Sequence, residues 1–78
     1  MSDTLSLNQL CEGQWGVVHR LTSLGSDRRR LQDIGLIEGT AVCRLQSSPA
    51  GDPIAYLIRG AVIALRLEDS AGVLVRPQ

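Results

Sequence analysis

The stretch from residue 28 to residue 53 constrains the fold more than any other part of this 78-residue chain. It reads RRRLQDIGLIEGTAVCRLQSSPAGDP, so a short basic segment ends at Gly35 and a second glycine, Gly39, follows closely. A glycine after an amphipathic segment is typical of a helix end, and clustered glycine and proline residues mark turns. The stretch therefore predicts a helix, a turn, a strand and a loop, in that order.

The predicted helix covers about residues 26–35. Ser26 is a candidate N-cap, and Asp27 lies in the first turn, where a negative charge complements the helix dipole. A helix of about ten residues is too short to be stable alone, so we expect it to pack on a sheet.

The end of this helix is specified by a glycine and three apolar residues. Leu31 and Ile34 share one face of the helix. Gly35 fits the left-handed position that follows a helix, which makes Leu31 and Leu36 the pair that touches in a Schellman motif. We therefore expect Leu31 and Leu36 to be buried.

The other segments have the β-branched and apolar content of short strands. After a short strand or lead-in and a turn at 5–12, strands are predicted at residues 15–21, 40–46, 54–59, 62–67 and 73–75. Gly16 suggests a bulge or a close backbone approach, and the alternation of 54–59 puts Tyr56 on one face with Ile54 and Ile58. Gly60 and Ala61 read as a tight turn, and residues 68–71 as one helical turn.

These elements predict a mainly β fold with one inserted helix. About five short strands favour a closed or nearly closed barrel, because closure removes exposed sheet edges. With 78 residues and no linker or repeat, residues 1–78 are expected to form a single domain.

Composition excludes several classes of function. The eight basic residues are all arginine and are balanced by eight acidic ones. Without lysine there is neither a P-loop nor Schiff-base chemistry, and without a positive surplus we expect no nucleic-acid binding. No apolar run reaches the roughly 20 residues that span a bilayer, and residues 1–5 lack the character of a signal peptide. The prediction is a cytoplasmic location.

The residues that could bind a metal or perform catalysis are few. His19, Cys11 and Cys43 have no metal-ligand spacing, and Cys43 reads as a small core residue. Cys11 with His19 is the one Cys–His pair that could be tested as nucleophile and base. We expect no cofactor, no metal site and no enzymatic activity.

Four segments in order resemble the ferrous iron transport protein A family, FeoA. The resemblance is carried by RRLQDIGLIEGT, SPAGDPI, ALR followed by EDSA, and SLNQLCEGQ, which are residues 29–40, 48–54, 64–66 with 68–71, and 6–14. Together they cover nearly the whole chain. Glu38 replaces a common proline, Ile34 a common leucine, and Gly72 a larger residue that would support the last strand.

This resemblance implies an SH3-like barrel. It also implies a small non-enzymatic accessory of bacterial ferrous iron uptake, which binds the cytoplasmic GTPase region of the FeoB-type transporter and modulates its assembly or GTPase activity. The alternative is a regulatory SH3-like domain that acts on a metal-dependent transcriptional repressor. The oligomeric state stays open.

Two surfaces are candidates for partner binding. The first is the helix face with Arg28, Arg30 and Ile37, and the second is the loop formed by Gly51, Asp52 and Pro53. The competing interpretation is a solvated arginine face with Ile37 packed against the barrel. Gly35, Gly39 and Gly51 read as architectural residues.

Overall fold

The computed structural model describes residues 3–78, so part of the N-terminal segment considered above lies outside the described chain. Its elements in order are β1 Leu5–Ser6, the 3-10 helix η1 Leu7–Gln9, β2 Trp15–Leu21, α1 Gly25–Asp33, β3 Ala41–Ser47, β4 Ile54–Ile58, β5 Ala61–Leu65, α2 Leu67–Ser70 and β6 Val73–Pro77. The fold is mainly β, which confirms the prediction. Within residues 3–78, none of the helices is long and apolar enough to cross a bilayer.

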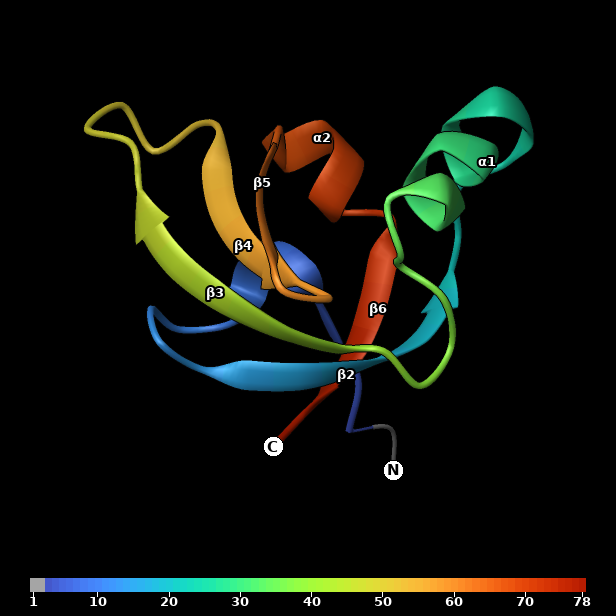
Figure 1. The fold of residues 1–78 in the computed structure, drawn as a ribbon, viewed down its shortest axis with the longest axis horizontal. Helices are drawn as coiled ribbons and strands as arrows, with labels where there is room; N and C mark the ends of the chain where they lie inside the picture. Colours follow the sequence, from blue (N-terminus) through green and yellow to red (C-terminus); the bar gives the residue numbers. More distant parts are fainter. Residues whose placement is uncertain (1–2) are drawn as a thin grey trace.

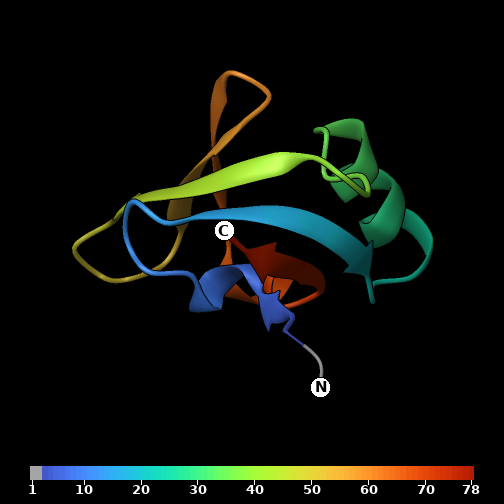
Figure 2. The ribbon, with the colours of Figure 1, turned by 90° about the horizontal axis from the view of Figure 1, so that it is seen from below.

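The strands form one antiparallel sheet in the order β1-β6-β2-β3-β4-β5. The sheet curls strongly, and α1 and α2 lie side by side above its open side (Figures 1 and 2). Six strands replace the predicted five because the lead-in contributes β1, a two-residue strand that pairs with β6. The curled sheet is the SH3-like barrel that the FeoA resemblance implied (Figure 1).

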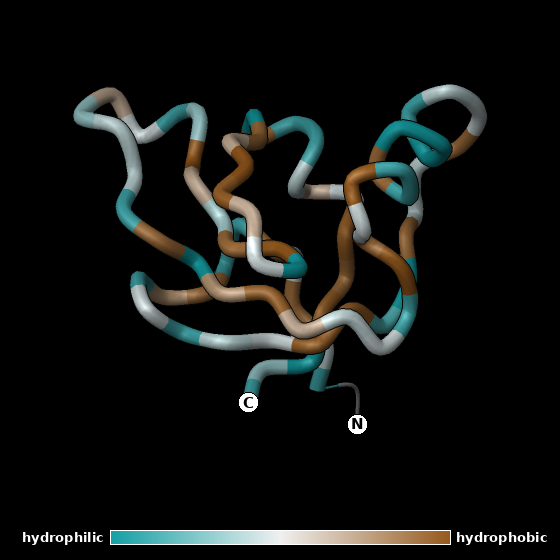
Figure 3. The backbone as a smooth tube through the Cα atoms, in the orientation of Figure 1, coloured by the Kyte–Doolittle hydropathy of each residue, from teal (hydrophilic) through white to brown (hydrophobic). Residues whose placement is uncertain are grey.

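One cluster of thirteen buried apolar residues fills the interior of the sheet. The predicted inner face of β4 is confirmed, because Ile54, Tyr56 and Ile58 are all buried. Cys43 is buried as well, but it lies outside this cluster, on the outer face of the sheet opposite Trp15 and Leu57. The strands β4, β5 and β6 contain hydrophobic segments, whereas polar residues gather on the turns of α1 (Figure 3). Burial of these side chains holds the sheet and α1 together.

Strand β2 contains both irregularities that Gly16 suggested, but at two different positions. A Cβ atom on Gly16 would lie 3.1 Å from Cγ2 of Val75, so glycine permits the close approach of β6. The bulge is at His19, where the pairing of β2 with β6 shifts between Val18 and Arg20.

Several predicted boundaries are wrong, and the last strand, β6, continues to Pro77 instead of ending at Val75. The hairpin turn is Arg59-Gly60 rather than Gly60-Ala61, and both turn residues have positive φ, 51° and 83°, which suits the twist of a two-residue hairpin. The strand predicted to reach Leu67 ends at Leu65, because Arg66 is already the N-cap of α2.

Candidate partner-binding surface

The end of α1 has the geometry that the glycine pattern predicted. Gly35 has φ +106°, the N–H of Leu36 donates to the carbonyl of Leu31 at 3.1 Å, and the N–H of Gly35 donates to that of Gln32 at 3.0 Å. This is a Schellman motif, and Leu31 and Leu36 are both buried. The chain then turns so that Ile37 points away from the core, with 45% of its surface exposed.

The start of α1 differs from the prediction. The helix begins at Gly25, one residue before the expected N-cap Ser26, and its N-cap is Leu24. Leucine has no side-chain oxygen that could accept a hydrogen bond from the first turn. Asp27 lies in the first turn, as expected.

A small groove separates α1 from β2, and we call it the α1–β2 groove. Its volume is about 190 Å³, and its walls are formed by Val18, His19, Arg20, Leu21, Arg28, Gln32, Leu36, Ile37 and Glu38. Arg28 Nη1 donates to the carbonyl oxygen of Leu21 at 3.1 Å, which holds the guanidinium against the end of β2. The structure therefore brings together Arg28 and Ile37, two of the predicted contact residues.

Sequence reasoning missed four polar residues of this groove: His19, Arg20, Gln32 and Glu38. His19 reaches it from the bulge in β2, and bulges commonly re-aim a side chain in this way. The sequence signal for a bulge was Gly16, which lies three residues too early. The groove combines one exposed apolar side chain with charges of both signs, and this composition suits contact with another protein. The groove is too small for a typical cofactor.

Arg30 lies outside the groove, on the side of α1 that faces α2. Its Nη2 is 2.7 Å from Oδ1 of Asp69, and this ion pair links the two helices. The pair borders a charged hollow of about 430 Å³ that is also lined by Asp27, Arg66 and Glu68. The three consecutive arginines therefore lie at three different surface depressions, since Arg29 borders a third one beside Gly25 and Ser26.

The Gly51-Asp52-Pro53 loop lies at the opposite end of the molecule from α1 (Figure 1). Gly51 has φ +82°, and its N–H donates to the carbonyl of Ser48 at 2.8 Å. Asp52 Oδ1 accepts the N–H of Leu67 at 3.0 Å, so this carboxylate satisfies the first turn of α2. Asp52 therefore has a structural role, whatever else the loop contacts.

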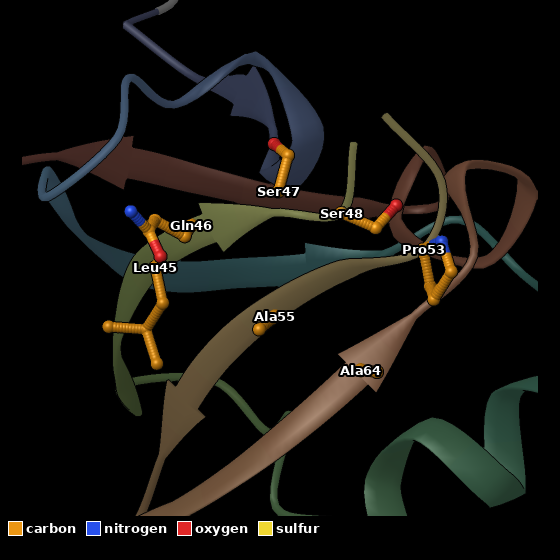
Figure 4. Close-up of a pocket in the computed structure, with 7 residues that line it drawn as sticks. All are labelled: Leu45, Gln46, Ser47, Ser48, Pro53, Ala55 and Ala64. Carbon is orange, nitrogen blue, oxygen red and sulfur yellow. The ribbon is translucent and has the colours of Figure 1, made fainter. Parts of the chain in front are cut away.

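Pro53 borders a shallow depression of about 620 Å³ on the outer side of β3, β4 and β5 (Figure 4). Its lining combines the apolar residues Leu45, Ala55 and Ala64 with the polar residues Gln46, Ser47 and Ser48. The second predicted surface is thus the edge of an apolar sheet face, separate from the α1–β2 groove.

Within residues 3–78, the candidate metal ligands and the Cys11–His19 pair do not come together at one site. No group of three or more His, Cys, Asp or Glu side chains could hold a metal ion in this part of the chain. Cys11 is exposed in the turn before β2, Cys43 is buried in the sheet, and His19 lies in the α1–β2 groove, whose walls include neither cysteine.

Tyr56 is a buried polar residue whose environment the sequence did not reveal. Its hydroxyl has no hydrogen-bond partner among the described residues. The nearby Ser70 hydroxyl points its single hydrogen toward the carbonyls of Arg66 and Leu67. Burial raises the pKa of this phenol above its ordinary value of 10.0, while Ser70 and the positive charge of Arg44 partly offset that effect. Tyr56 faces the core and is no candidate for chemistry.

A curled antiparallel sheet with two short helices over its open side, and an exposed mixed groove beside α1, defines a small SH3-like domain. Residues 5–77 match the model of the FeoA domain, so the chain belongs to the FeoA family.

Known relatives agree with this assignment. The chain is 31% identical over 71 residues to an Fe(2+) transport protein A/Fe(2+) transporter FeoB fusion protein of Porphyromonas gingivalis, a match that covers 91% of this chain and 8% of that protein. FeoA of Chlorobium tepidum has 30% identity and a TM-score of 0.86, covering 94% of this chain and 70% of that one. FeoA of Stenotrophomonas maltophilia, a prokaryotic SH3 domain protein solved with zinc, has 25% identity and a TM-score of 0.81, covering 91% and 88%.

The fold also recurs in a manganese-dependent transcriptional repressor. That structure has a TM-score of 0.88 but 19% identity, and the match covers 100% of this chain and 38% of the repressor chain. This likeness concerns the fold alone and carries no argument for transcriptional regulation.

Proposed function

We propose that this chain is a non-enzymatic accessory of bacterial ferrous iron uptake. It acts in the cytoplasm, binds the cytoplasmic GTPase region of a FeoB-type transporter, and modulates assembly or GTP turnover. The observation that carries the proposal is the Porphyromonas gingivalis relative, in which the FeoA and FeoB names belong to one fusion protein. A fusion raises the effective concentration of one part for the other, which is useful when the two parts interact.

The α1–β2 groove is the contact surface that the geometry favours. Ile37 offers an exposed aliphatic side chain, Arg28 is pre-positioned by its bond to Leu21, and Glu38 adds an opposite charge beside them. An apolar anchor with a charged rim is the usual composition of a protein interface. The rigid Schellman turn holds this anchor in one place, so little entropy is lost when a partner binds.

The other predicted contacts fit this surface less well. Arg30 is engaged with Asp69 and would have to leave that ion pair to contact a partner. Asp52 is engaged with α2, so changes at Gly51, Asp52 or Pro53 would alter folding as well as any binding. We keep Arg30 and this loop as secondary contacts.

The proposal is tested by NMR titration of the labelled chain with the purified GTPase region of the cognate transporter, with and without a GTP analogue. We expect chemical-shift changes around residues 28–38, and we expect Ile37→Asp or Arg28→Glu to weaken binding by about tenfold or more. Arg29→Glu is the matched control, because Arg29 is an exposed neighbour that does not line the groove.

Three results would count against the proposal. Shifts confined to the 51–53 loop would move the interface to the second surface. Equal weakening by Arg29→Glu would show that Arg28→Glu acts through the overall charge of α1 and not through a contact in the groove. No shifts at high concentration would exclude the GTPase region as the partner.

A further inference from the structure

Strand β5 is an unprotected sheet edge. It is the last strand of the sheet and pairs with β4 on one side in a register without a bulge. Among residues 3–78, the hydrogen bonds outside this β4–β5 pairing do not reach residues 61–65. Most natural edge strands carry a charge, a proline or a bulge that prevents pairing with another chain, but β5 reads AVIAL and has none of these.

The outer face of the sheet continues this apolar edge. Val62, with 68% of its surface exposed, pairs with Leu57, Leu57 pairs with Cys43, and Cys43 pairs with Trp15, so one apolar row crosses four strands. A second row begins with Ala64 opposite Ala55 and reaches Leu45 across the depression in Figure 4. Both rows stop at the free edge of β5.

We propose that β5 pairs with β5 of a second copy of this chain, antiparallel and about a twofold axis at Ile63. In that register Val62 lies opposite the partner's Ala64, and Ala61 lies opposite the partner's Leu65. Ile63 meets its own copy on the axis, each of the two other large side chains meets an alanine, and all five residues of the strand are paired. A register shifted to place Val62 opposite Val62 would bring Leu65 against Arg59 and leave the strand ends mismatched.

The choice of a second copy follows from this self-complementarity. A twofold interface requires that one surface fit a second copy of itself. In β5, the residue sizes on one side of the central Ile63 complement those on the other side when the strand is paired antiparallel with its copy. The pairing also joins the outer rows, since Val62 meets the partner's Ala64 on the same face. The formal net charge of zero adds no long-range repulsion between copies. No residue of β5 lines the α1–β2 groove, so the inference stands apart from the proposed transporter contact.

Sedimentation velocity of the full chain over a wide concentration range tests the pairing. We expect a concentration-dependent species of twice the monomer mass, and we expect Val62→Lys to raise its dissociation constant by about tenfold or more, because a charge on the edge opposes strand pairing. Leu24→Lys is the matched control, since Leu24 is an equally apolar residue, 81% exposed, at the start of α1. Circular dichroism checks that both variants fold.

Disulfide trapping tests the register. In a Cys11→Ser background, chains with Val62→Cys are mixed with chains of different mass that carry Ala64→Cys. Residues directly opposite in an antiparallel pair lie within disulfide reach, whereas diagonal ones are farther apart. We therefore expect disulfide-linked dimers between the two kinds of chain and few within either kind.

Two outcomes would overturn the inference. One is a chain that stays monomeric at every concentration. The other is a dimer that Val62→Lys leaves intact, or one that cross-links as readily within a single variant as between the two.

Discussion

At the scale of the residue, Gly35 shows how one position can determine the shape of a surface. Its φ of +106° ends α1, buries Leu31 and Leu36, and turns Ile37 outward. A side chain there meets two obstacles, because the backbone conformation is strained for L-residues and the new Cβ would lie 2.6 Å from Cδ of Arg59.

Gly35→Ala is expected to lower the free energy of unfolding by about 1–3 kcal/mol. Gly39→Ala is the control for backbone strain alone, since Gly39 has φ +91° and a Cβ added there would meet no atom within 4 Å. Denaturant titration of both variants separates the two effects. An unchanged stability of Gly35→Ala would contradict the described helix end.

Tyr56 gives a prediction about pH. Because burial raises the pKa of the folded phenol above 10.0, the unfolded chain ionises first as pH rises. The stability from the neutral phenol is complete below pH 10 and is lost as pH rises through the folded pKa. Tyr56→Phe should therefore remove part of the alkaline loss of stability, and it should cost little at neutral pH because the hydroxyl has no partner. Unfolding curves at about pH 8 and pH 10.5 compare the two chains. An equal alkaline loss in both would contradict the role of Tyr56.

At the scale of the element, what the sequence could predict depended on how local each signal was. The end of α1 was predictable because Leu31, Gly35 and Leu36 are close in the chain. Its start was not, since Leu24 gives no capping signal. Strand β1 could be predicted only as an alternative to a lead-in, because two residues carry no periodicity and the partner strand β6 comes from the far end of the chain.

The residues of the candidate site also fall into those that the sequence could predict and those that it could not. The sequence placed Arg28 and Ile37 on one exposed region, but it could not show that Arg30 turns toward Asp69, which is 39 positions later. Nor could it show that a bulge brings His19 to the same groove. Contacts between distant segments arise from the curl of the sheet, which no local pattern encodes.

The short helix α2 depends on a carboxylate from another loop. Asp52 Oδ1 accepts the N–H of Leu67, so Asp52→Ala should lower stability by about 0.5–2 kcal/mol, the usual effect of losing an N-terminal capping bond. Asp33→Ala, on the exposed end of α1, is the matched control and should change stability by less than about 0.5 kcal/mol. Thermal unfolding of both variants measures the difference. Equal effects would show that the bond to α2 contributes nothing.

At the scale of the whole molecule, α1 and the sheet share one core. Leu31 and Leu36 belong to the same buried cluster as Val18, Tyr56 and Val75. The groove between α1 and β2 therefore exists only while the whole domain is folded, and we expect α1 to unfold together with the sheet.

Leu31→Ala tests this coupling. Removing a fully buried leucine should lower the free energy of unfolding by about 2–5 kcal/mol, and it should do so for the whole domain rather than loosen α1 alone. Denaturation followed by Trp15 fluorescence, which reports on β2, and by helix-sensitive circular dichroism should then give coincident transitions in the variant as in the parent chain. Leu24→Ala should leave both curves nearly unchanged, because Leu24 contributes little to the core. If the helical signal were lost well before the fluorescence signal, α1 would be an independently unfolding element, and the α1–β2 groove would have to form only when a partner binds.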